Sequence, residues 1–134
     1  MSPRPRALAA GVVVLTLASG CGSAADDDAA ERAAHFYAAI AADDAAAACA
    51  DLAPEARESL EEQEGKPCAD SILDQQLPGD TGQGEARVYG SMAQVEYPDE
   101  TAFLSRYDDR WLLTAVGCPP RSGDQPHDCA IEVG

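Results

Sequence analysis

Large apolar residues are scarce in most of this chain. Between Cys21 and Gly134, 7 Leu, 3 Ile, 4 Val and 2 Phe make up 16 of 114 residues, about 14%. The same stretch has 7 Lys or Arg and 24 Asp or Glu, so its formal charge is 7 − 24 = −17. Highly charged chains with so few large apolar residues are often disordered, so a folded domain here needs support beyond a large hydrophobic core. The acidic excess also argues against nucleic-acid binding, because phosphate recognition needs clustered Lys and Arg.

The first 20 residues have the pattern of an export signal. Arg4 and Arg6 precede an uncharged run over 7–19, and small residues end this run in front of Cys21. The run is shorter than the roughly 20 apolar residues of a membrane-spanning helix. Its Ala-Ser-Gly-Cys ending resembles the lipobox of bacterial lipoproteins, in which the cysteine is acylated and the signal is cut off directly before it. We therefore expect residues 1–20 to be a lipoprotein signal peptide.

Cys21 is the expected lipidation site. A diacylglycerol on this thiol would place two acyl chains in the bilayer, and at about 0.8 kcal/mol per buried CH₂ a two-chain anchor is stable. We expect residues 21–28 to form the lipidated cysteine and an acidic linker. Residues 29–134 would then be a single domain on the outer, extracytoplasmic face of the cell membrane. Ordinary secretion that leaves the Cys21 thiol free is the alternative.

The other four cysteines predict two disulfide bonds, because exported proteins fold in an oxidising compartment. Four cysteines allow three pairings. We predict Cys49 with Cys68 and Cys118 with Cys129, since each pair lies within one sequence-local structural block. Each bond would stabilise the fold by about 3 kcal/mol, which helps to offset the thin core. A zinc site is not favoured, because structural zinc ligands usually come in pairs two to four residues apart, and no metal is expected.

Residues before Glu85 favour helices. Acidic residues at 26–28 suit a helix start, and Ala33, Phe36, Tyr37 and Ile40 then recur at helical spacing. Asp43 and Asp44 would end this helix and cap the next one. We predict three more helices from Pro positions, caps and Gly stops. They cover 45–52, 54–63 with Gly65 as its stop, and a segment that starts at Pro67, runs through 72–73 and is ended by Pro78-Gly79.

Residues from Glu85 onward favour strands. Counting Leu, Ile, Val, Phe, Tyr, Trp and Met, 12 of the 22 large apolar residues after the signal lie between positions 85 and 116. Gly90-Ser91 predicts a tight hairpin turn, after which Ala93, Val95 and Tyr97 would share one face. The predicted strands cover 87–89, 93–97, 101–107, 110–116 and 129–133. This half of the chain would therefore supply most of the core.

The order of these elements resembles the nuclear transport factor 2-like cone, in which helices pack into the concave face of a curved sheet. It implies an α+β fold with N-terminal helices packed on a curved antiparallel sheet of four to five strands. A family of small actinobacterial lipoproteins of unknown function is similar in its lipobox and in the phrases Ala48-Cys49, Pro67-Cys68-Ala69, Trp111-Leu112-Leu113, Gly117-Cys118-Pro119-Pro120 and Asp128-Cys129. The similarity covers nearly all of the chain after the signal but implies no established chemistry.

The cone fold often encloses an apolar pocket between its helices and its sheet. The residues that would line or fill such a pocket here are Phe36, Tyr37, Ile40, Phe103 and Trp111. Some cone proteins act on ketosteroids or polyketides with an Asp base and Tyr or Asp hydrogen-bond donors. A comparable set in this chain would combine a carboxylate with a tyrosine, drawn from Asp99, Asp108, Tyr37, Tyr89, Tyr97 and Tyr107.

No catalytic residue or cofactor is expected, because Asp99 and Asp108 lie in predicted turns, where Asp is ordinarily solvated. His35 would lie on a helix surface, and His127 in the loop that a disulfide closes. We therefore expect a membrane-anchored, non-enzymatic binding or accessory module of the cell envelope. Its partner would be an envelope protein or a small apolar ligand. The alternatives are a small-ligand carrier or enzyme that uses an open cavity containing a polar group, and a structural spacer.

Overall fold

The computed structural model describes residues 23–79, 81–120 and 123–134. The predicted signal peptide and Cys21 lie outside these residues. Helical elements come first along the described chain and strands follow. In chain order they are α1 (Ala24–Ala41), α2 (Ala45–Asp51), α3 (Pro54–Glu64), the 3₁₀ turns η1 (Cys68–Asp70) and η2 (Ile72–Gln75), β1 (Glu85–Tyr89), β2 (Met92–Glu96), β3 (Thr101–Tyr107), β4 (Arg110–Cys118) and β5 (Ile131–Glu132).

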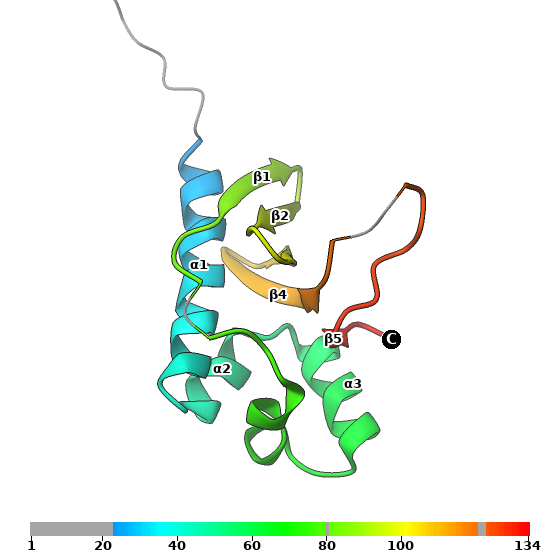
Figure 1. Cartoon of the computed structure of the whole chain (residues 1–134). Helices are drawn as coiled ribbons and strands as arrows, with labels where there is room; N and C mark the ends of the chain where they lie inside the picture. The colour runs from blue at the N-terminus through cyan, green and yellow to red at the C-terminus, as the bar shows by residue number, and fades with distance from the viewer. Residues whose placement is uncertain (1–22, 80, 121–122) are drawn as a thin grey trace, which may run out of the picture.

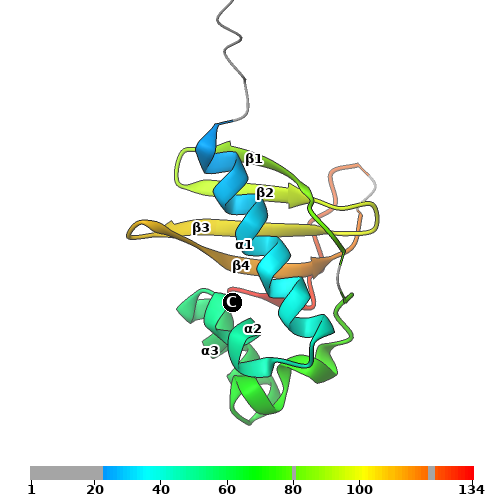
Figure 2. The same cartoon turned by 90° about the vertical axis from the view of Figure 1, so that its left-hand side faces the viewer.

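The strands form one open antiparallel sheet in the order β1-β2-β3-β4-β5. Helix α1 crosses one face of this sheet, and α2 and α3 lie toward its β5 end (Figures 1 and 2). The predicted α+β class, with helices N-terminal to an antiparallel sheet, is therefore confirmed. None of the helices in the described ranges has the length and apolar content that crossing a bilayer requires.

Helix α1 begins earlier than its sequence pattern predicts. Ser23 is the N-cap residue, and its hydroxyl accepts a hydrogen bond from the Asp26 backbone while the Asp26 carboxylate accepts one from the Ser23 backbone. Such a capping box satisfies N–H groups that a helix start otherwise leaves unpaired. Asp26 Oδ1 also accepts a hydrogen bond from the Val88 N–H at 3.0 Å, which ties the helix start to β1. Residues 24–28 therefore belong to the helix, and not to the acidic linker predicted over 21–28.

The region after α3 differs more from its prediction. Gly65 ends α3 with a φ of 67°, as expected for a glycine stop. The single helix predicted from Pro67 through Ile72 and Leu73 is instead the pair of 3₁₀ turns. The Ser71 hydroxyl donates to the carbonyl oxygens of Pro67 and Cys68, at 3.2 and 3.3 Å. Such local side-chain bonds compete with helical hydrogen bonding, so the chain turns here and does not extend a helix.

The sheet core follows strand alternation. Ala93, Val95 and Tyr97 are buried on one face, as predicted, and Gly90 takes the positive φ of 63° at the predicted hairpin turn. The pairing of β3 with β4 shifts register between Thr101 and Leu104. Such irregularities bend a sheet and sharpen its twist. The buried cluster joins this face to α1, α2 and α3 as one continuous core.

Both predicted disulfides are present. Cys49 is bonded to Cys68, which joins α2 to η1, and Cys118 is bonded to Cys129, which joins the end of β4 to the segment before β5. The first bond fixes the 3₁₀ region against the helices, and the second closes the long loop beside the sheet.

Candidate functional site

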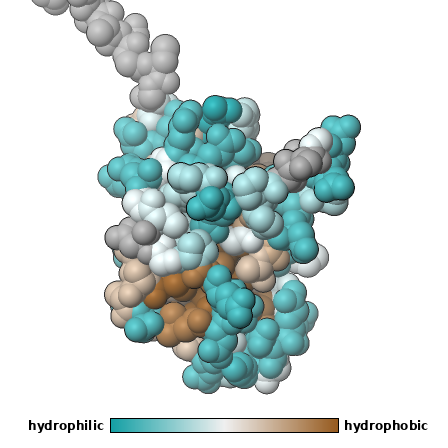
Figure 3. Space-filling view, viewed as in Figure 1, coloured by the Kyte–Doolittle hydropathy of each residue, from teal (hydrophilic) through white to brown (hydrophobic). Residues whose placement is uncertain are grey.

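A cavity of about 680 Å³ opens between three parts of the chain: the segment after η2, the turn between β2 and β3, and the segments on either side of the Cys118–Cys129 bond. Figure 3 shows hydrophobic residues gathered on this face over the segment that follows η2. We call it the Glu100 cavity, and the wall residues used below are Leu77, Tyr97, Asp99, Glu100, Gly117, Pro119, Asp128 and Ala130. A glycine is needed in this wall at position 117. Its φ is +65°, and a Cβ there would lie 2.8 Å from both Ala130 Cβ and Leu77 Cδ2.

Glu100 is the buried polar residue of this cavity, with only 5% of its surface exposed. It lies directly before β3, where its carbonyl oxygen accepts a hydrogen bond of 2.8 Å from the Tyr97 N–H. Continuing the strand alternation back from Leu104 and Ala102 places Glu100 on the same inward face. The Oε1 atom of Glu100 is buried and has no hydrogen-bond partner among the described residues.

Two tyrosines surround this carboxyl group. The rings of Tyr37 and Tyr97 pack edge to face with their centroids 5.3 Å apart, and Tyr97 lines the cavity while Tyr37 is fully buried behind it. Burial raises the pKa of Glu100 above its ordinary value, the nearby Tyr37 hydroxyl offsets part of the rise, and the charge of Asp99 adds to it. Burial, with the neighbouring Glu100 carboxyl, also raises the pKa of Tyr37 far above the usual range. A carboxyl group in such surroundings is a strong acceptor for a donor or cation brought by a ligand.

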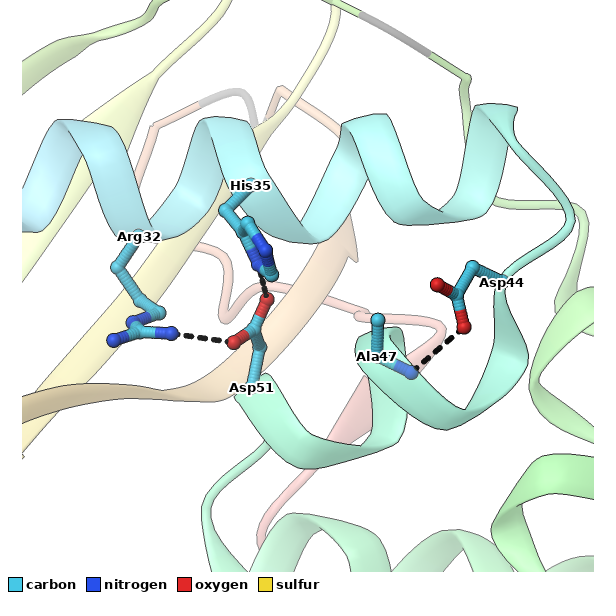
Figure 4. A network of polar contacts seen from close by, with 5 residues as sticks. All are labelled: Arg32, His35, Asp44, Ala47 and Asp51. Carbon is cyan, nitrogen blue, oxygen red and sulfur yellow. Dashed lines mark hydrogen bonds and ion pairs between the residues drawn. The ribbon is translucent and has the colours of Figure 1, made fainter.

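A second polar cluster joins α1 to α2 (Figure 4). Asp51 has a side chain only 3% exposed, and its two oxygens lie 2.6 Å from Arg32 Nη1 and 2.5 Å from His35 Nδ1. Asp51 is in the last turn of α2, where the helix dipole disfavours negative charge. The cationic Arg32 and the imidazole of His35 satisfy both oxygens, so this cluster holds the two helices together.

A smaller hollow of about 380 Å³ adjoins this cluster, between α1 and the start of β4. Arg32, His35, Arg110 and Trp111 line it together with three carboxylates, so its charges are mixed. Arg32 and His35 already bind Asp51, and the Arg106 guanidinium stacks over the Trp111 ring, 4.8 Å from its centroid. A structural role accounts for these contacts, and the Glu100 cavity is the stronger site.

The five residues considered from the sequence as lining or filling a helix–sheet pocket do not line one cavity together. Phe36 and Tyr37 are fully buried, Ile40 packs against the same core, and Trp111 is buried at the smaller hollow. Phe103 lies on the other side of its strand from Ala102 and Leu104, and its ring packs 5.0 Å from that of His127. Because these side chains fill the helix–sheet interface or lie outside it, none of the five lines the Glu100 cavity, which opens instead at one end of the sheet.

Only some of the carboxylates and tyrosines considered from the sequence as a catalytic set lie near one another. Asp99 is exposed at the cavity rim, while Asp108 is exposed at the turn between β3 and β4. Tyr89 is 63% exposed, and the Tyr107 hydroxyl donates to Glu55 at 2.7 Å. Sequence reasoning missed Glu100, although its alternation with Ala102 and Leu104 was a usable signal.

Asp51 was missed as well. His35 was expected on the helix surface, and its side chain is 60% exposed, but its contact with Asp51 was not foreseen. Asp51 follows the buried Ala48 by three residues, a spacing that places both on one helix face. No three His, Cys, Asp or Glu side chains meet as a metal site within the described ranges.

Comparison of the chain with known protein families, with curated proteins and with solved structures gives no match.

Proposed function

We propose that this chain is a lipid-anchored extracytoplasmic module that binds a small molecule in the Glu100 cavity without transforming it. The cavity with a buried carboxyl group in its wall is the observation that carries this proposal. Its volume of about 680 Å³ falls within the range of small-molecule sites, which are roughly 300–1,000 Å³. Such sites combine an apolar lining with a few polar groups that orient the ligand.

The lining has this mixed character. Leu77, Pro119 and Ala130 supply apolar surface, and Tyr97 supplies an aromatic ring. Glu100 supplies the orienting polar group. Its backbone is fixed by the hydrogen bond from the Tyr97 N–H, and Tyr37 lies beside its side chain. A binding site that is already formed in the folded chain needs little reordering when a ligand enters. The proposed role is therefore a carrier or receptor at the membrane surface.

Filling the cavity tests the binding proposal. Ala130 lines the cavity and has no polar side-chain group. Ala130→Phe therefore fills part of the cavity without removing a polar contact of the side chain. We expect this variant to weaken binding of the neutral fluorescent probe N-phenyl-1-naphthylamine by about tenfold, which corresponds to about 1.4 kcal/mol. Fluorescence titration of the purified full chain measures it, with the signal of detergent alone subtracted.

The matched control is Ala46→Phe, which adds the same ring at an exposed position of α2. We expect it to bind the probe like the unmodified chain. Binding that is unchanged in Ala130→Phe, or absent from the unmodified chain, would contradict the proposed site.

The anchor is tested separately. We expect Cys21→Ser to abolish incorporation of labelled palmitate into the chain, because the thiol that would carry the diacylglycerol is gone. The control Ser23→Ala leaves that thiol in place and should be labelled normally. Labelled Cys21→Ser protein would show that the lipid is attached elsewhere, and an unlabelled parent chain would show that there is none.

A further inference from the structure

The Glu100 cavity carries one sign of charge. Three of its lining residues, Asp99, Glu100 and Asp128, have carboxyl side chains. None of the described lining residues is Lys, Arg or His. Carboxylates gathered around a partly enclosed cavity raise the local concentration of cations and repel anions. Charge alone therefore selects against acidic ligands.

Glu100 gives an observation independent of this cluster. The residue is 5% exposed, and its Oε1 atom is buried and has no hydrogen-bond partner among the described residues. Buried carboxyl oxygens are nearly always paired, and an unpaired one costs stability. An ammonium group is the complementary partner, because it brings both N–H donors and a positive charge.

The other walls define the rest of the ligand. Tyr97 presents an aromatic ring, and aromatic faces attract ammonium groups. Leu77, Pro119 and Ala130 offer apolar surface to a hydrocarbon body. A bare metal ion would use none of this surface, and the carboxylates do not meet as a metal-binding group in the described residues.

We infer that the Glu100 cavity binds a hydrophobic amine, an organic cation whose ammonium group faces Glu100 and whose apolar body contacts Leu77, Pro119 and Ala130. This inference rests on the proposed binding function and adds the chemical class of the ligand. It requires the cavity to distinguish molecules that share a hydrocarbon body and differ only in the polar group at one end.

Three probes of one shape test this requirement: 4-phenylbutylamine, 4-phenylbutanol and 4-phenylbutyrate. Isothermal titration of the purified full chain with each compound gives its affinity. We expect the amine to bind about tenfold more tightly than the alcohol, and the carboxylate to bind most weakly. Glu100→Gln should remove about tenfold of the amine's affinity and leave the alcohol's within about twofold. The matched control Glu62→Gln, at an exposed position of α3, should change neither.

The outcomes separate the two proposals. If the alcohol or the carboxylate binds as well as the amine and Ala130→Phe blocks it, the cavity is a binding site but the amine inference is wrong. The same conclusion follows if Glu100→Gln keeps the full preference for the amine. If no probe binds, both the inference and the proposed function fail.

Discussion

Replacing Cys49 and Cys68 together by Ser is expected to lower the free energy of unfolding by about 3 kcal/mol. The two cysteines are 19 residues apart in sequence, and their bond restricts the unfolded chain, which therefore loses less conformational entropy on folding. Both are also buried, at 6% and 2% exposure, so the variant places two hydroxyl groups in the core. A loss of this size is a large share of the 5–15 kcal/mol typical of a folded domain.

Chemical denaturation of the double variant and of the parent chain measures this difference. The reductant dithiothreitol provides the internal control, because it should destabilise the parent chain more than the double variant, which lacks this bond. Retention of the parent's stability to within about 0.5 kcal/mol would mean that the bond adds little to the fold.

Local signals in the sequence were enough to predict most elements. Asp44 caps α2, Pro54 starts α3 and Gly65 ends it, because each effect depends on residues close in sequence. The strand over 101–107 was predicted with the bounds observed. Both disulfides were predicted as well, since each joins segments that are neighbours along the chain.

The candidate site depends on contacts that local patterns do not contain. The Glu100 cavity needs the segment after η2, the turn before β3 and the chain around Cys118–Cys129 to meet in space. Glu100 follows Pro98 and Asp99, and this local sequence indicates a solvated turn. In the structure, however, packing against Tyr37 of α1 buries Glu100. The sequence left open whether the helix–sheet interface encloses a pocket, and in the structure Phe36 and the other core side chains fill this interface.

Replacing Glu100 by Gln is expected to stabilise the chain by about 2 kcal/mol at neutral pH. The substitution keeps the shape of the side chain and removes the charge from a group that is 95% buried. It also introduces an amide N–H₂ that can donate to the Tyr37 hydroxyl beside it. A stabilising substitution at a buried position is typical of sites where function keeps a group that the fold alone would not favour.

The stability gained by Glu100→Gln should increase with pH, because the pKa of Glu100 is raised in the folded chain. Burial raises that pKa above the ordinary 4.5, the nearby Tyr37 hydroxyl partly opposes the rise, and the charge of Asp99 adds to it. Two further titratable residues, Tyr97 and Asp128, line the same cavity.

Between pH 4.5 and the raised value, the folded chain holds a proton that the unfolded chain has lost, so the parent loses stability as the pH rises through this window. Below the window Glu100 is neutral in both states, and the Gln variant and the parent should have nearly equal free energies of unfolding. Above it the difference should reach its full value and stay constant. Urea denaturation of parent and variant from pH 4 to 8 measures the difference, with Glu62→Gln as the exposed control. A difference that is absent at pH 8, or that shrinks as the pH rises, would mean that the buried carboxyl has a partner that compensates its charge.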